Sequence, residues 1–192
     1  MKDKVLMVVF ILILGAVLTT ALVGVDYYTA DRIKANKLFK LRTRVLDALN
    51  IPCAPAEVEA KFQGSVETKL IGEKNFYTSQ DGNVAFEFNG SGLWGPIHGV
   101  LALSSDLKTI KGLTIIHQEE TPGLGGRISE ADFLNKFRDK DISSGLVITP
   151  PDRASAVNEV DGITGATLTS KAFGAIINSQ AKEYRLLYEK GN

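Results

Sequence analysis

Residues 161–167 read DGITGAT, and they lead directly into a segment, about Thr169 to Tyr188, whose apolar side chains recur at helical spacing. Glycine and alanine leave little side-chain bulk in this heptapeptide, so another molecule can approach its backbone closely. The start of a helix presents unpaired N–H groups and a partial positive charge, which would stabilise a bound or esterified phosphate. Four hydroxyl side chains lie in or just after the loop, namely Thr164, Thr167, Thr169 and Ser170. On physical grounds the stretch is either a phosphate site or a turn of small residues with a hydroxyl N-cap.

Segments with a period of two lie upstream of this loop and predict a β-sheet. The expected strands are Val66–Ile71, Val84–Phe88, Ile97–Leu103, Ile110–His117 and Leu146–Ile148. A helical pattern covers Ala56–Phe62 and ends at Gly64. A second pattern covers about Glu130–Arg138, with Ser129 placed as its N-cap. Strands and helices mixed in this order predict a compact α+β domain, which we assign to residues 55–192.

The N-terminus carries an apolar segment long enough to cross a bilayer. No charged residue occurs from Val5 to Val25, and this run would span about 31 Å as a helix at about 1.5 Å per residue. The run is longer than a signal-peptide core and passes straight into a helical pattern, so we expect a retained anchor. The expected organisation is a cytoplasmic N-terminus and transmembrane anchor over residues 1–25, followed by a juxtamembrane helix and linker over residues 26–54. That helix is expected to stop at Ile51-Pro52, since proline disfavours a helical residue before it.

Basic residues on both sides of the span give opposing indications about its orientation. Lys2 and Lys4 precede the span, and five basic residues follow it: Arg32, Lys34, Lys37, Lys40 and Arg42. The larger number after the span favours a cytoplasmic domain. Long domains are translocated largely regardless of these counts, so the charges alone leave the orientation open.

Composition excludes several classes of function. The chain has 22 basic and 22 acidic residues, so it lacks the positive field that collects nucleic acid. Its single cysteine, Cys53, cannot form an internal disulfide or supply an iron–sulfur cluster, so redox chemistry would need an organic cofactor. The two histidines, His98 and His117, show no ligand spacing, so no metal site is expected. Glu119 and Glu120 are adjacent carboxylates before a turn, and we expect both to be solvated.

The heptapeptide resembles the flavinylation motif of the FMN-binding domain family, which reads Asp, three residues ending in Ser or Thr, then Gly-Ala-Thr. All fixed positions match, and residues 168–170 also continue as in the family. The resemblance implies that a Mg²⁺-dependent flavin transferase joins the Thr167 hydroxyl to the phosphate of FMN. It also implies a cofactor-binding role for the neighbouring residues Asp161, Thr164, Gly165, Ala166, Leu168 and Thr169. No catalytic residue is expected, because no base for a nucleophilic Thr167 is identifiable nearby in the sequence.

Two further segments carry the same resemblance. Residues 120–126 read ETPGLGG and follow a predicted strand that contains a histidine, and residues 92–96 read GLWGP. Taken alone, a glycine-rich loop of this kind is either a surface for a flat ring or a tight connection between elements. The family resemblance implies a place against or beside the isoalloxazine ring of FMN for Thr121, Gly123, Leu124 and Trp94.

Within the family, the chain is similar to the G subunit of the Rnf electron-transport complex and to the C subunit of the sodium-pumping NADH:quinone reductase. Both resemblances imply an electron-carrying subunit of a membrane-bound, ion-translocating redox complex, with other membrane subunits as partners and the FMN domain on the periplasmic or outer side. Because the chain is compact, the Rnf-type ferredoxin:NAD oxidoreductase is the preferred prediction. The chain has no Gly-rich βαβ unit for NADH, so it is not expected to act on small molecules alone. The alternatives are the reductase subunit, a membrane-anchored flavin sensor, and an anchored hydrolase that needs no flavin.

Overall fold

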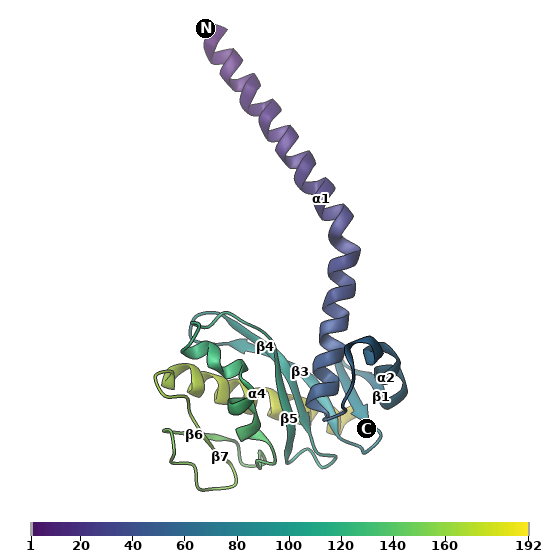
Figure 1. The fold of residues 1–192 in the computed structure, drawn as a ribbon, viewed down its shortest axis with the longest axis vertical. Helices are drawn as coiled ribbons and strands as arrows, with labels where there is room; N and C mark the ends of the chain where they lie inside the picture. The colour runs from purple at the N-terminus through teal and green to yellow at the C-terminus, as the bar shows by residue number, and fades with distance from the viewer. Residues whose placement is uncertain (1, 192) are drawn as a thin grey trace. The chain divides into compact units, whose positions relative to one another are not determined.

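The computed structural model describes residues 2–191 and divides the chain into two compact units, one up to Phe39 and one from Lys40 onward. Helix α1, Lys2–Ala48, supplies the described part of the first unit and the beginning of the second (Figure 1). Its large apolar side chains between Val5 and Val25 are exposed. Among the described residues, α1 is the one helix that is long and apolar enough to cross a membrane. The predicted continuation of the apolar run into a helix is confirmed.

The second unit is built on an antiparallel sheet whose strands pair in the order in which they follow one another (Figure 1). These strands are β1 Val66–Ile71, β2 Lys74–Ser79, β3 Val84–Ser91, β4 Pro96–Leu103 and β5 Ile110–Gln118. The predictions for β1, β3, β4 and β5 are confirmed, with small differences at the ends. Strand β2 is missing from the prediction, because Phe76 and Tyr77 are its only large apolar residues, and as neighbours they show no alternation.

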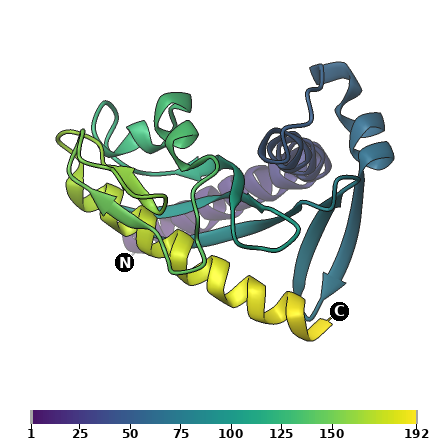
Figure 2. The same cartoon turned by 90° about the horizontal axis from the view of Figure 1, so that it is seen from below.

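Helix α4, Thr167–Gly191, lies along one face of the sheet (Figure 2). Phe173 and Tyr184 of this helix enter a core that also contains Phe86 and Phe88 of β3. The rings of Phe86 and Tyr184 are stacked with their centroids 4.0 Å apart. The predicted last helix is therefore confirmed, and its apolar side holds it on the sheet.

The opposite face of the sheet carries the C-terminal end of α1 and the short helix α2, Val58–Ser65, which follows the 3₁₀ turn η1, Pro55–Glu57. Leu46 and Phe62 form this second core with Tyr77 of β2. The sheet thus has an apolar layer on both faces, which explains why consecutive residues are buried over 84–86 of β3 and 99–103 of β4. The predicted short helix over Ala56–Phe62 is present, although it runs past Gly64 to Ser65.

Backbone hydrogen bonds around Asn50, and not the proline, terminate helix α1. Asn50 has a φ of 58°, and its N–H donates to the Asp47 carbonyl oxygen at 3.1 Å, while the Ile51 N–H donates to the Leu46 carbonyl oxygen at 2.9 Å. This pair of bonds around a left-handed residue is the Schellman motif, in which Asn is tolerated. The stop predicted at Ile51-Pro52 therefore comes too late, because Asn50 ends the helix before the proline is reached.

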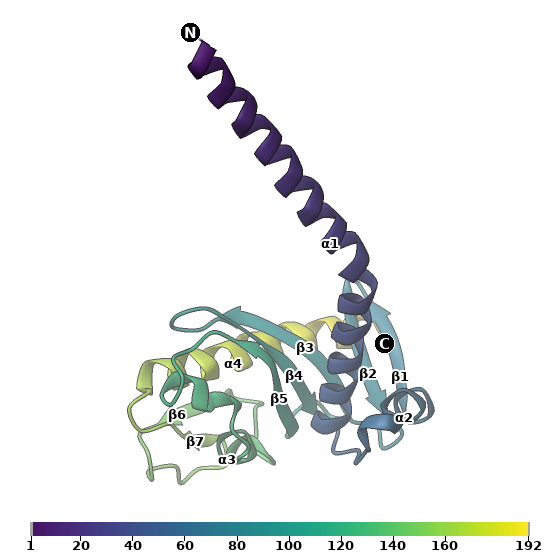
Figure 3. The same cartoon turned by 45° about the horizontal axis from the view of Figure 1, so that its top comes forward.

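Short elements close the domain beyond the sheet (Figure 3). They are η2 Gly125–Ser129, α3 Ala131–Leu134, η3 Asn135–Phe137, and the parallel pair β6 Val147–Thr149 and β7 Glu159–Asp161. The helical segment predicted over Glu130–Arg138 is present as α3 followed directly by η3, but Ser129 does not cap it, because Ser129 is the last residue of η2. Glu130 precedes α3 without a side-chain cap, and the chain tightens into η3, which places Phe133 and Phe137 against Phe173. The α+β class predicted for the domain is confirmed.

Candidate cofactor site

Three loops that are far apart in the sequence line one hollow on the second unit. The lining residues are Leu93 and Trp94 between β3 and β4, Thr121, Leu124 and Gly125 after β5, and Gly165, Ala166, Thr167, Leu168 and Thr169 at the start of α4. Every predicted cofactor residue except Asp161, Thr164 and Gly123 therefore lies at this hollow.

Thr167 is the first residue of α4, and its side chain is exposed. The loop before it is held by Ser170, which is fully buried: its Oγ donates to the Ala166 carbonyl oxygen at 2.9 Å and accepts the Ile163 N–H at 3.0 Å. Gly165 has a φ of +80°, a conformation that residues with a Cβ rarely adopt. The loop thus places the Thr167 hydroxyl at a helix start, where the N–H groups of the first turn have no partner four residues earlier.

Large apolar side chains surround this hydroxyl without being buried. The exposed fraction is 73% for Trp94, 63% for Leu168, 47% for Leu124 and 46% for Leu93. A Cβ added to Gly165 would lie 3.4 Å from Cδ2 of Leu124, so the two glycine-rich loops are in van der Waals range of each other. Such a patch of exposed apolar groups is typical of a surface that another molecule covers.

Glu120 is buried, with an exposed fraction of 4%, so the expectation that both carboxylates before the turn are solvated is wrong for this residue. Its Oε1 accepts the N–H groups of Leu93 at 2.7 Å and Trp94 at 2.9 Å, and its Oε2 accepts the Thr169 hydroxyl at 2.7 Å. Glu119 is exposed, as expected. The glycines near Glu120 are the sequence feature that could have indicated its burial, because only small residues leave room for a buried carboxylate between loops.

The three predicted residues outside the hollow have other surroundings. Asp161 accepts the N–H groups of Ala154 and Arg153, both at 2.8 Å, and these bonds lower the pKa of its carboxyl below the ordinary value. Thr164 lines a separate hollow, and Gly123 has a φ of +73°, which suits glycine at a turn. Asp161 thus closes the loop between β6 and β7.

Residues 92–182 match the family model described as the FMN-binding domain. The matched range contains all three loops of the hollow. Residues 92–182 are therefore similar to the FMN-binding domain family.

Two relatives of this chain are subunits of ion-translocating oxidoreductases. The C subunit of the Na⁺-translocating NADH-quinone reductase of Haemophilus ducreyi is 31% identical over 77% of this chain and 60% of the relative. The G subunit of the proton-translocating ferredoxin:NAD⁺ oxidoreductase complex of Clostridium ljungdahlii is 29% identical over 79% of this chain and 76% of the relative. The chain spans less than two thirds of the reductase relatives that it matches, 60% for Haemophilus ducreyi and 33% for Chlamydia pneumoniae.

A solved relative has the same fold. The crystal structure of the C subunit of the Na⁺-translocating NADH-quinone reductase from Parabacteroides distasonis superposes with a TM-score of 0.67 at 28% identity, covering 81% of this chain and 95% of that one. The structure of the corresponding protein from Shewanella oneidensis also gives 0.67, at 20% identity, which supports the fold alone.

The hollow of the FMN-binding domain suits FMN in its chemistry. A flat, largely apolar ring would cover the exposed faces of Trp94 and Leu124, and a phosphate would meet the hydroxyl and N–H groups at the start of α4. The histidines offer no competing centre: His98 lies 3.0 Å from a Glu87 carboxylate oxygen and His117 lies 3.1 Å from one of Glu119. Within residues 2–191 no group of three or more possible metal ligands occurs.

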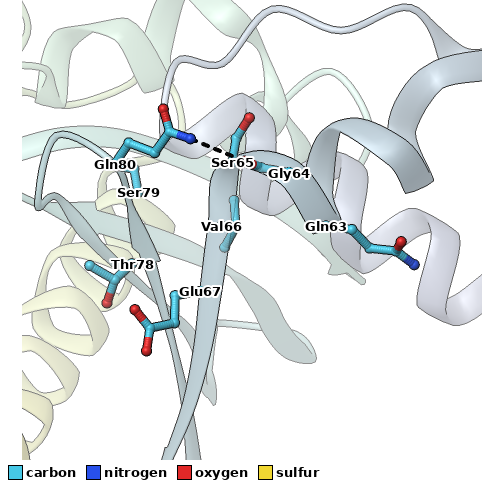
Figure 4. Close-up of a pocket in the computed structure, with 8 residues that line it drawn as sticks. All are labelled: Gln63, Gly64, Ser65, Val66, Glu67, Thr78, Ser79 and Gln80. Carbon is cyan, nitrogen blue, oxygen red and sulfur yellow. Dashed lines mark hydrogen bonds between the residues drawn. The ribbon is translucent and has the colours of Figure 1, made fainter.

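Another hollow of the second unit lies at the edge of the sheet, where α2 passes into β1 (Figure 4). It is lined by residues 63–67 and 78–80, and the Gln80 side-chain amide donates to the Gly64 carbonyl oxygen at 3.1 Å across it. None of the predicted cofactor residues lies there.

Proposed function

We propose that this chain is an electron-carrying subunit of a membrane-bound, ion-translocating redox complex of the ferredoxin:NAD oxidoreductase type, with FMN attached covalently to Thr167. The observation that carries the proposal is the exposed Thr167 hydroxyl at the start of α4, inside an apolar hollow of an FMN-binding domain. The other complex considered, the quinone reductase, has relatives of similar identity, but the chain accounts for a larger share of the ferredoxin-complex relative.

The residues of the hollow have separate tasks in this proposal. Thr167 would hold FMN through a phosphoester bond to its Oγ1; the hydroxyl proton would leave with the departing phosphate group of an activated flavin donor. The N–H groups of the first turn of α4 stabilise the remaining negative charge of the phosphodiester. Trp94 and Leu124, whose side chains are exposed at the hollow, would exclude water from one side of the ring. FMN itself supplies the electron-transfer chemistry when bound.

The test of the proposal is purification of the complex from native membranes. We expect a flavin absorption spectrum that stays with this chain after denaturation, a peptide mass for residues 161–171 increased by FMN, and copurifying subunits with several membrane spans. A flavin sensor would carry the flavin without those subunits, and an anchored hydrolase would carry no flavin. Either result would replace the carrier assignment.

Leu124→Asp tests the contact between the second loop and the ring. We expect FMN to remain attached but its reduction potential to become more negative, because a carboxylate in the hollow disfavours the added electron. A redox titration of the purified protein measures this shift. Leu70→Asp is the matched control, since Leu70 is also exposed, on β1. Equal potentials in both variants would remove Leu124 from the cofactor site.

The orientation proposed for the FMN domain is outside the cytoplasm, with α1 as the single anchor. In a Cys53→Ser background, Val157→Cys places a thiol at a residue that is 72% exposed. A membrane-impermeant maleimide should label this thiol in intact cells, whereas Lys2→Cys should react only after lysis. The reverse pattern would put the domain in the cytoplasm, as the basic residues after the span suggest.

A further inference from the structure

Glu120 is the one acidic side chain that is buried among the residues the structure describes. It accepts three hydrogen bonds, and each comes from a residue that lines the hollow: Leu93, Trp94 and Thr169. Glu120 itself belongs to the third loop, beside Thr121. One carboxylate therefore joins all three loops that meet at Thr167.

The loops are closed tightly around this carboxylate. A Cβ on Gly92 would overlap Oε1 of Glu120, and a Cβ on Gly125 would lie 2.8 Å from its Oε2 and 2.7 Å from Oγ1 of Thr169. The backbone N–H of Glu120 is in turn held by Oε1 of Gln118 at 2.6 Å. The carboxylate cannot move far without breaking these hydrogen bonds, so it holds the three loops in fixed positions relative to one another.

We propose that Glu120 is a positioning residue for the attachment of FMN to Thr167. Thr169 lies two residues after Thr167, so its bond to Oε2 fixes the helical turn that carries the acceptor hydroxyl. Oε1 simultaneously fixes the Trp94 loop, which forms the apolar wall beside that hydroxyl. The length of the Glu120 side chain, and not its charge, fixes the position of the Thr167 hydroxyl relative to Trp94. This inference rests on the proposed covalent site.

Two substitutions of Glu120 distinguish the effect of side-chain length from the effect of charge. Glu120→Gln keeps the length of the side chain: its carbonyl oxygen can accept the two N–H groups and its amide can donate to Thr169 Oγ1. Glu120→Asp keeps the charge but is shorter by one methylene, so it cannot reach both sets of donors. The full-length variants and the parent protein are incubated with flavin transferase and its flavin donor, and the rate of appearance of in-gel flavin fluorescence is measured. Circular dichroism and thermal unfolding establish that each variant is folded.

The expected result is attachment within about twofold of the parent rate for Glu120→Gln, and at least about tenfold slower attachment for Glu120→Asp, the size expected when one or two hydrogen bonds are lost. Normal attachment in Glu120→Asp, or a Glu120→Gln variant as slow as Glu120→Asp, would overturn the proposal. If the parent protein itself gains no flavin, the covalent site fails, and the positioning role fails with it. If the parent gains flavin and both variants match it, the site stands and only the role of Glu120 falls.

Thr169→Val provides a second test that leaves Glu120 in place. Valine keeps the branched shape and removes the one hydroxyl that ties α4 to Oε2. Attachment should be slowed several-fold, by about the value of one lost hydrogen bond. An unchanged rate in folded Thr169→Val protein would contradict the proposal even if Glu120→Asp does not fold.

Discussion

Thr167→Val is expected to yield a folded protein with no covalent flavin. Valine keeps the β-branched shape at the first position of α4 but has no oxygen to bond to phosphorus. The side chain is exposed and makes no contact on which the core depends, so stability should change by less than about 0.5 kcal/mol. The variant is coexpressed with the transferase, denatured, separated on a gel and examined for flavin fluorescence, which should fall to background.

Two neighbouring substitutions serve as controls for this result. Thr167→Ser restores a hydroxyl at the same position and should recover fluorescence, while Thr164→Val should reduce attachment without abolishing it, since Thr164 lines a different hollow. Peptide mapping of residues 161–171 identifies the acceptor directly. A fluorescent Thr167→Val band, or FMN found on Thr164 or Thr169, would show that the acceptor is misassigned.

Gly112→Ala is expected to destabilise the domain by about 3 kcal/mol, the upper part of the range for overpacking a core. A Cβ at this position of β5 would overlap the carbonyl oxygen of Ala48 and lie 2.9 Å from its carbonyl carbon. These are backbone atoms, and they cannot rotate away as the end of a side chain can. The helix end is also tied to β5 by the Thr114 hydroxyl, which donates to the Arg44 carbonyl oxygen at 3.0 Å. The end of α1 must therefore shift away from the sheet.

Urea unfolding of the full chain in detergent, followed by circular dichroism, measures this loss as a lower midpoint with an unchanged slope. Gly64→Ala is the matched control, because a Cβ there meets nothing within 4 Å and alanine suits a helix. It should leave stability unchanged or raise it by about 0.5 kcal/mol. Equal midpoints for the two variants would mean that the approach of Ala48 to Gly112 is not a tight contact in solution.

The elements that sequence reasoning predicted well are those whose pattern is local. Strand β5 is rich in apolar and β-branched residues and helix α4 carries a helical period, so their existence follows from nearby residues alone. Strand β2 escaped prediction because the burial of Phe76 and Tyr77 depends on layers contributed by distant segments on both faces of the sheet. The helix expected after Ser129 is present, but its second half is the 3₁₀ turn η3, and the contact of Phe137 with Phe173 across the core is not visible in the local sequence.

Some residues of the candidate site can likewise be predicted from the local sequence, and others cannot. Thr167 could be identified from a short motif, because the small residues and hydroxyls that mark it are consecutive. The meeting of that motif with Trp94 and Leu124 was implied by resemblance only, since no spacing rule brings three separate loops together. The burial of Glu120 cannot be predicted from the sequence, because a carboxylate is ordinarily exposed and this one is buried by donors from two other loops.

The hydrogen bonds of buried Ser170 have a consequence for how a transferase would recognise its substrate. Fixing the backbone of one residue costs about 1–2 kcal/mol of conformational entropy. In the folded domain, Ser170 already fixes the turn between Ile163 and Ala166, so this entropy is lost on folding and not on binding. A free peptide of the same sequence would have to lose this entropy at the moment of transfer. A transferase would therefore recognise the folded conformation of the acceptor loop as well as its sequence. It can bind the loop in the folded domain without ordering a flexible segment first.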